Sequence, residues 1–376
     1  MFDDIRPYMD SEIPAAMQRI TVDPLFPAVA GYIFPNRPLE EVRKEVRAMD
    51  TIHAFQMGFM SKAIRSIISK TTCDYSYSGM ENVDPTRPHV FVSNHRDIVM
   101  DASLLQMALL EHGFDTTEIT FGANLMQGSL VIDMGKSNKM FRVERPGNDM
   151  RAFLESSRHL SEYIFHTIRQ KGQSIWIAQR NGRTKDGIDR TDPGIINMFT
   201  MGTNLPPADA LTRLSLHPVS VSYEWEPCDI LKVVELVNKE SGPYVKADGE
   251  DFNSIMTGLL QQKGMVHLHV CPEISAEELD SMSSESLPSF RKSVADLIDS
   301  RICSAYKLSP NNYVAHDLRS GSSSYASHYT DEQKEAFIRH METLHRYDGT
   351  YDVDKLMHYL LGIYANPVDS YNLFDR

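Results

Sequence analysis

The segment His89-Val-Phe-Val-Ser-Asn-His-Arg-Asp-Ile-Val-Met-Asp101 decides the fold and holds the strongest candidate for chemistry. Its first five residues form a short apolar run, which predicts a buried strand. A helical pattern begins at Asp101 and ends at Gly113, a residue type that commonly ends helices. His95 therefore lies in a loop between a buried strand and a helix. In open α/β sheets ligands bind at the carboxyl ends of strands, so a functional residue is expected in this loop.

Predicted strands and helices continue to alternate along the chain after this segment. Short apolar runs predict further strands, and a long amphipathic stretch at 149–169 predicts a helix. The predicted strands lie at 118–121, 139–144, 174–178, 216–223 and 266–270. Strands that alternate with helices indicate an α/β core.

The two ends of the chain differ in character from this core. Residues 1–37 are rich in proline and are expected to be irregular, whereas 39–70 show helical spacing in two pieces. Residues 276–305 read as a polar helical stretch, 320–324 as a flexible spacer, and 330–364 as two amphipathic helices. The predicted division is an N-terminal segment with helices (1–80), an α/β core (81–275) and a C-terminal helical extension (276–376).

Composition narrows the class of protein. The 376 residues are 41% hydrophobic and 24% charged, which is ordinary for a globular chain. The net charge of −13 argues against general nucleic-acid binding, which needs a positive surface. Cysteines at 73, 228, 271 and 303 form no C-x-x-C pair, which indicates a reducing compartment, and no secretory signal or spanning segment is visible. The expected location is cytoplasmic, with contact at the inner face of the membrane.

His95 has two carboxylates nearby in sequence, Asp97 and Asp101. A carboxylate that accepts a hydrogen bond from Nδ1 of an imidazole leaves Nε2 free to take a proton, as general-base catalysis requires. The structural alternative is that Asn94 and His95 satisfy backbone groups of the loop, with Asp101 as a helix N-cap.

Basic residues gather between 139 and 190. Lys and Arg outnumber Asp and Glu there by eleven to six, in a chain that is acidic overall. Two clusters, 141–146 and 179–187, follow predicted strands, and the second contains Gly182. Basic side chains around a glycine-containing loop are suited to holding a phosphate. The nucleotide-binding glycine loops and the G-x-S-x-G nucleophile motif are absent from the sequence.

Four blocks in order resemble the glycerophospholipid acyltransferases, the glycerol-3-phosphate and lysophosphatidate acyltransferases of the PlsB/PlsC type. They are Asn94-His95 with Asp101, Val143-Glu-Arg145, Arg180-Asn-Gly-Arg-Thr184 and His217-Pro-Val219. The resemblance covers about residues 85–275 and is strongest to a soluble bacterial branch. It implies a mixed, mostly parallel sheet flanked by helices.

The resemblance also implies a reaction and its residues. His95 would be the base that removes a proton from an acceptor hydroxyl, which then attacks the thioester of acyl carrier protein or coenzyme A. Asp101 would be its partner, with Asp97 as the alternative. No metal or other cofactor is implied. The implied substrate-binding residues are Asn94, Arg142, Arg145, Asn181, Gly182, Arg183 and Lys185, with Pro218 shaping the wall of the acyl channel.

Two departures from the family pattern leave alternatives open. Five residues separate His95 from Asp101, where the family has four, and Asn181 stands where the family usually has Glu. The acceptor is expected to be glycerol-3-phosphate, lysophosphatidate or a related lipid, but Asn181 also allows an amino-acid lipid. From a different class, the chain would be a non-catalytic lipid- or carrier-binding protein of the same fold.

A competing site lies on the last predicted strand. His267, His269 and Cys271 alternate there, so their side chains are expected on one face. Such a set is able to bind zinc, although simple packing of this face is the favoured interpretation.

Overall fold

The computed structural model describes residues 2–144, 149–240, 242 and 244–374. Within this part of the chain, seven strands form one sheet in the order β1-β7-β6-β2-β5-β3-β4. The β6 and β7 strands pair antiparallel, and the other neighbours pair parallel. The strands are β1 (Thr72–Ser78), β2 (Val90–Ser93), β3 (Glu118–Gly122), β4 (Met140–Val143), β5 (Ile175–Ala178), β6 (Leu216–Tyr223) and β7 (Gly264–Val270). The predicted mixed, mostly parallel α/β sheet is confirmed.

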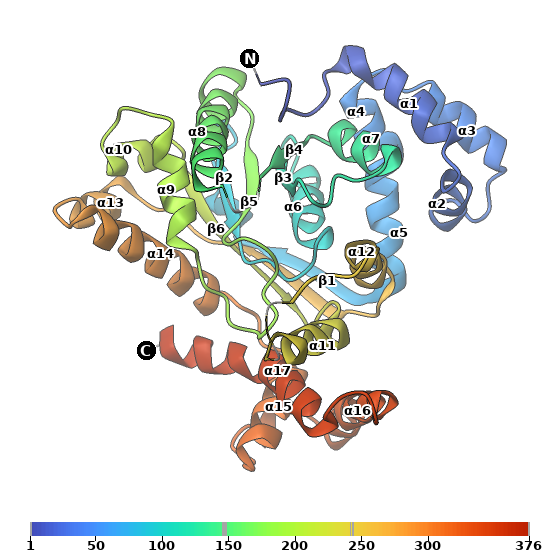
Figure 1. Ribbon diagram of the computed structural model, residues 1–376, viewed down its shortest axis with the longest axis vertical. Coiled ribbons are helices and arrows are strands. Elements are labelled where there is room, and N and C mark those ends of the chain that lie inside the picture. Colours follow the sequence, from blue (N-terminus) through green and yellow to red (C-terminus); the bar gives the residue numbers. More distant parts are fainter. Residues whose placement is uncertain (1, 145–148, 241, 243, 375–376) are drawn as a thin grey trace.

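Both faces of the sheet are covered because its central strands are apolar on both sides. Val90 and Val92 of β2 point into one core and Phe91 into the other, as the two-residue period of a strand requires. On the first face the core is closed by α8 (Met150–His166), α9 (Pro193–Met201), α10 (Pro207–Thr212), α13 (Ala276–Met282) and α14 (Leu287–Ser304). On the second face it is closed chiefly by α5 (Ser61–Thr71) and α6 (Met100–Glu111). Figure 1 shows these two groups of helices on opposite sides of the strands.

The N-terminal segment is more regular than its prolines predicted. Residues 13–22 and 26–33 are helices α1 and α2, so the expectation of an irregular segment is wrong there. Pro14 and Pro27 lie in the first turn of each helix, where the missing N–H costs nothing. These helices form a separate apolar cluster with α3 (Leu39–Arg47), α4 (Ile52–Phe55) and α7 (Ser129–Ser137).

Strand β1 was missed from the sequence, and it adds residues 72–78 to the sheet edge beside β7. Its sequence alternates short polar residues with aromatics and carries no apolar run, so the pattern of a buried strand is absent. The division of the chain at 80 and 275 stays a prediction. The sheet crosses both boundaries, because it includes β1 from before residue 80 and its core includes α14 from beyond residue 275.

The C-terminal helices form a fourth apolar cluster below the sheet in Figure 1. The helices of this cluster are α11 (Asp229–Glu240), α15 (Pro310–Ser320), α16 (Asp331–Glu342) and α17 (Val353–Phe374), and α12 (Glu250–Leu260) lies outside it. The two helices predicted over 330–364 are present, and α17 continues ten residues further, through Pro367. No helix among the described residues combines the length and the apolar character that crossing a bilayer demands.

Candidate functional site

His95 follows directly from the carboxyl end of β2 and faces the first turn of α6. Its Nδ1 lies 3.0 Å from Oδ2 of Asp101. A carboxylate only accepts, so Nδ1 carries the hydrogen and Nε2 keeps its lone pair. Asp101 is fully buried, whereas the His95 side chain keeps 14% of its surface exposed. The imidazole is therefore anchored on its buried side and open on the other.

Asp101 is held as an acceptor by four donors. Besides His95, the backbone N–H groups of Arg96 and Asp97 donate to Oδ2 at 2.6 and 2.9 Å, and the Tyr223 hydroxyl donates to Oδ1 at 2.7 Å. Burial and the adjacent Asp101 raise the pKa of Tyr223 well above its ordinary value, so its hydroxyl stays protonated. The loop of five residues between His95 and Asp101 folds back so that its own backbone binds the carboxylate.

Asp97 has a different position. Its Oδ1 accepts from the N–H groups of Val99 and Met100 at 2.8 and 2.7 Å, at the start of α6. It thus satisfies backbone groups that a helix leaves open at its N-terminus. Of the two carboxylates proposed as the partner of His95, the structure brings Asp101 to the ring, and Asp97 starts the helix.

A buried cluster of charges fixes the His95 loop from behind. The Arg96 guanidinium, 1% exposed, donates to Asp189 at 2.7 Å and to Glu226 at 3.3 Å. The Lys232 ammonium donates to Glu226 and to the Arg96 carbonyl, at 2.5 and 2.8 Å. Two cations thus meet two carboxylates, so the cluster has no net charge. Burial disfavours the Arg96 cation, but Asp189 and Glu226 outweigh burial and raise its pKa well above the ordinary value.

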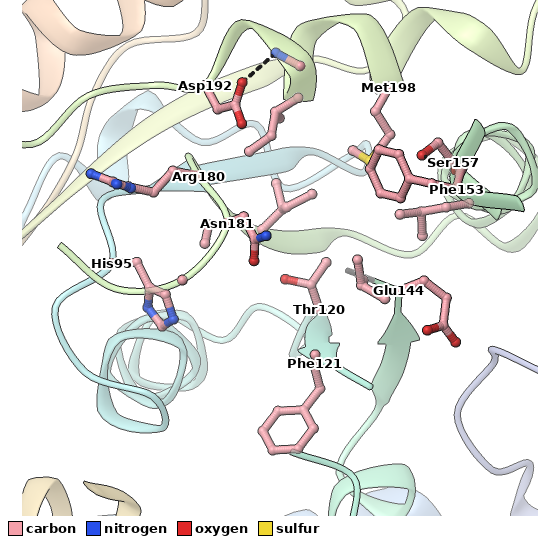
Figure 2. Close-up of a pocket in the computed structure, with 18 of the residues that line it drawn as sticks. His95, Thr120, Phe121, Glu144, Phe153, Ser157, Arg180, Asn181, Asp192 and Met198 are labelled. Carbon is pink, nitrogen blue, oxygen red and sulfur yellow. Dashed lines mark hydrogen bonds between the residues drawn. The ribbon is translucent and has the colours of Figure 1, made fainter. Parts of the chain in front are cut away.

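An apolar cavity of about 300 Å³ opens beside His95. It runs between the ends of β3, β4 and β5 on one side and α8 and α9 on the other. Figure 2 shows His95 and Asn181 on one side of this cavity and Phe153, Ser157 and Met198 on the other. The apolar lining includes Ile98, Phe121, Leu125, Val143, Phe153, Leu154, Leu160, Trp176, Ile177, Ile195, Met198 and Met201.

A second cavity, of about 280 Å³ and polar, meets the first at His95. The two share six lining residues: His95, Ile98, Leu125, Arg180, Asn181 and Gly182. The second adds Arg183, Lys185, Lys239 and Lys246, against the acidic Asp186 and Asp251. Its lining is therefore positive in an acidic chain.

The cations of this basic cavity differ in how far they are already paired. Lys185 forms an ion pair with Glu235, and Lys246 forms one with Asp251. Burial, with a smaller effect of the neighbouring Lys239, lowers the pKa of Lys185 to about 8, and Glu235 opposes this shift. The Nη1 of Arg183 is buried and has no hydrogen-bond partner in the protein. Arg183 thus has a buried donor that is unused.

The backbone of the loop at 180–187 holds its side chains beside His95. Gly182 has a φ of 74°, in the left-handed region where glycine is favoured. The N–H of Thr184 donates to the His95 carbonyl at 2.7 Å, and the Thr184 hydroxyl donates to Asp189 at 2.8 Å. These bonds join the third sequence block to the first.

Of the predicted substrate-binding residues, Asn181, Gly182, Arg183 and Lys185 line the cavities beside His95, whereas Asn94, Arg142 and Pro218 do not. Asn94 is fully buried and bonds through its side-chain amide to the backbone of Val221 on β6. Arg142 pairs with Glu144 at 2.7 Å, and only Glu144 lines a cavity. Pro218 is buried within β6 opposite Val92 and lines neither cavity. Arg145 lies outside the described residues.

Several lining residues were not singled out from the sequence. Arg180 belongs to the basic run that the sequence did indicate, but Lys239 and Lys246 come from α11 and the segment after it, far along the chain. Trp176 packs edge-on against His95, with ring centroids 5.7 Å apart. In sequence Trp176 is one apolar residue of a predicted strand, and nothing marks it as a neighbour of His95.

The residues of the competing zinc site are otherwise engaged. Both ring nitrogens of His267 lie within 3.0 Å of serine hydroxyls on β1, and Nδ1 of His269 lies 2.8 Å from Ser78. The Cys271 thiol points to the Arg301 carbonyl. Within the described part of the chain, these three do not form a group with converging ligand atoms.

Comparisons with known proteins give little beyond the fold. No family model matches the chain, and no curated protein matches its sequence. Among solved structures, the chain is similar to the 1-acyl-sn-glycerophosphate (LPA) acyltransferase PlsC from Thermotoga maritima. The identity is 14% and the TM-score 0.35, over 76% of this chain and 92% of that chain. At this level of similarity the likeness alone assigns no function.

Proposed function

We propose that the protein is an O-acyltransferase that moves a fatty acyl group from a thioester to a hydroxyl of a phosphate-bearing lipid precursor. The observation that carries this proposal is the position of His95 where an apolar and a basic cavity meet. The apolar cavity is suited to an acyl chain, and the basic one to a phosphate. A base at their junction stands between the two reacting groups.

In this proposal the Nε2 of His95 takes the proton of the acceptor hydroxyl as its oxygen attacks the thioester carbonyl carbon. The tetrahedral intermediate then collapses, the carbon–sulfur bond breaks, and the leaving thiolate takes the proton back from the imidazolium. Asp101 holds the ring orientation and stabilises the positive charge that the ring carries between the two transfers. No acyl-enzyme is formed, and atoms and charges balance without a cofactor.

The donor is proposed to be a thioester of acyl carrier protein or coenzyme A, and the acceptor glycerol-3-phosphate, lysophosphatidate or a related lipid. Support comes from Arg183, whose unused donor suits a phosphate oxygen, and from Arg180 and Lys185 beside it. A guanidinium binds phosphate through a planar fork, which fixes orientation as well as charge.

An amino-acid lipid remains the second candidate acceptor because of Asn181. This side chain lines both cavities and is neutral where the related family usually carries Glu. A neutral amide lowers the repulsion that a carboxylate-bearing head group would meet there. The third alternative, a non-catalytic binding protein, would have gained support from a His95 without a partner carboxylate. The 3.0 Å contact with Asp101 argues against it.

The direct test is transfer of a labelled acyl group, measured for the wild type and for His95→Ala with glycerol-3-phosphate and lysophosphatidate as acceptors. The expected result is loss of transfer in the variant with its thermal unfolding unchanged. His166→Ala, at a partly exposed histidine on α8 outside both cavities, is the matched control and should keep full activity. Equal transfer by wild type and His95→Ala would end the proposal. An acceptor series that includes amino-acid lipids separates the two acceptor classes.

Contact with the inner face of a membrane stays a prediction. It follows from the acyl substrates and requires a local apolar or basic patch, because a chain of net charge −13 is repelled by anionic lipid.

A further inference from the structure

Two buried histidines and a carboxylate meet at the edge of the sheet opposite His95. His89 immediately precedes β2, and His217 is the second residue of β6, so both lie where these parallel strands begin. Glu273 follows β7, which runs antiparallel to β6 and therefore ends at this same edge. Three segments distant in sequence thus bring one potential ligand each.

The tautomer of each histidine is fixed by a backbone carbonyl. The Nε2 of His89 lies 2.8 Å from the Asp84 carbonyl, and the Nδ1 of His217 lies 3.0 Å from the Cys271 carbonyl. A carbonyl only accepts, so these nitrogens carry the hydrogens. The lone pairs are left on Nδ1 of His89 and on Nε2 of His217. Metal-binding histidines are commonly oriented in this way by a carbonyl behind the ring.

Both lone-pair nitrogens are buried without a hydrogen-bond partner in the protein. His89 is 1% exposed and His217 is 0% exposed. An unsatisfied buried acceptor costs about 1–3 kcal/mol, so two at one place are a large penalty for a fold to carry. A cation between them removes both penalties at once.

The distances suit a small cation. One ligand atom from each of His89, His217 and Glu273 lies within 4.8 Å of the other two, and the Nε2 of His217 is 3.8 Å from Oε2 of Glu273. The imidazole rings are nearly perpendicular, at 82°, with centroids 4.8 Å apart. Ligand atoms around tetrahedral zinc are about 3.3 Å apart, given bonds of about 2.0–2.1 Å. Closing the difference takes shifts of up to about 1.5 Å, part of which the partly exposed Glu273 side chain has room to make.

We propose that His89, His217 and Glu273 form a binding site for a divalent transition-metal ion, with Zn²⁺ as the favoured ion. Two imidazoles and one carboxylate are a donor set that zinc accepts, leaving a fourth position for water. Arg87 is 43% exposed and now donates to Glu273, Asp84 and the Ser215 hydroxyl, so the ion would replace this guanidinium as the partner of Glu273. The ion would tie the start of β2, the start of β6 and the end of β7 together.

The test uses the full-length protein stripped of metal and titrated with Zn²⁺ in a calorimeter, with thermal unfolding measured in parallel. The wild type is expected to bind one equivalent and to unfold at a higher temperature when loaded. His217→Gln removes a buried ligand, and Glu273→Gln removes one at the surface, where the fold tolerates substitution. Each should weaken binding at least about tenfold, since even changes behind a ligand cost 10- to 100-fold. Cobalt should give the visible absorption of a tetrahedral ion in the wild type and lose it in both variants.

The matched control is His267→Gln, which changes a histidine on the neighbouring strand β7 outside the cluster. It should bind Zn²⁺ as the wild type does. The proposal is overturned by a wild type that binds no Zn²⁺, by binding that survives in both ligand variants, or by binding that is lost in His267→Gln. Because metal binding is the readout, each outcome is independent of whether the protein transfers acyl groups.

Discussion

The Asp101→Asn substitution tests the central contact of the proposed mechanism. Asp101 accepts from His95, from two backbone N–H groups and from Tyr223. The amide oxygen of Asn is able to replace Oδ2 and keep three of these donors. Its NH₂ group would then face the Tyr223 hydroxyl, which can accept but loses its own acceptor. We expect a stability loss of about 1–3 kcal/mol and a folded protein.

The effect on the rate is much larger because the charge disappears. With the ring nitrogen and the carboxylate oxygen 3.0 Å apart and an effective dielectric constant of about 20, the imidazolium gains about 5 kcal/mol from Asp101. That is an upper bound of about 10⁴-fold in kcat, at about 1.4 kcal/mol per factor of ten. The same change beside the histidine of a serine protease costs about 10⁴-fold. We therefore expect kcat to fall by about 10³- to 10⁴-fold with little change in KM.

The assay is steady-state transfer of labelled acyl groups, with circular dichroism and thermal unfolding to confirm the fold. Asp97→Asn is the paired variant, because Asn caps a helix about as well as Asp. It should keep kcat within a few-fold of the wild type. Asp101→Asn with a near-normal kcat would refute the role of Asp101, and a large loss in Asp97→Asn alone would give the partner role to the other carboxylate.

Three further predictions concern the two cavities. Arg183→Gln should raise KM for the phosphate-bearing substrate about 10- to 100-fold, because a charge-assisted hydrogen bond contributes about 1.5–3 kcal/mol; an unchanged KM would show that phosphate binds elsewhere. Burial lowers the pKa of Lys185 to about 8, so its ammonium loses its charge as the pH rises through this value. The same KM should then rise by up to about tenfold per pH unit above 8, and Lys185→Arg, charged throughout, should remove this rise. Met198→Trp fills part of the apolar cavity and should shift a competition assay toward shorter acyl chains, by about fourfold in kcat/KM for each excluded methylene at about 0.8 kcal/mol; unaltered chain-length preference would place the acyl chain outside this cavity.

The α/β core could be predicted because its strands are buried on both faces and therefore apolar throughout. Residues 216–223, for example, form β6 with the bounds that the sequence predicted. Strand β1 could not be predicted, because its serines form hydrogen bonds with histidines of β7 where a buried strand would carry apolar side chains. Helices α1 and α2 were missed because proline was taken as a breaker where it stands in a first turn.

At the site, the sequence predicted His95 and the basic loop at 180–187 as functional. They lie close in space because they follow β2 and β5, which are parallel neighbours in the sheet. The pairing with Asp101 needed the path of the loop, which spacing alone left open between two carboxylates. Lys239 and Lys246 reach the basic cavity through the packing of α11 and the segment after it, and no local pattern encodes that. The role of Asn94 stays a prediction, and the motif alone did not reveal that its side chain bonds to the backbone of Val221 and to Asp189.

The buried charges behind His95 also make the support of its loop depend on residues far along the chain. Arg96 reaches Glu226, 130 positions later, and the Glu226 N–H in turn donates to the hydroxyl of Tyr364, a further 138 positions on. Until α17 has been made, Glu226 lacks that neighbour, and the loop it anchors is incompletely held. We expect the nascent chain to fold its sheet before the His95 loop is fixed. The His95 loop would then be fully held only once Tyr364 of α17 has taken its place.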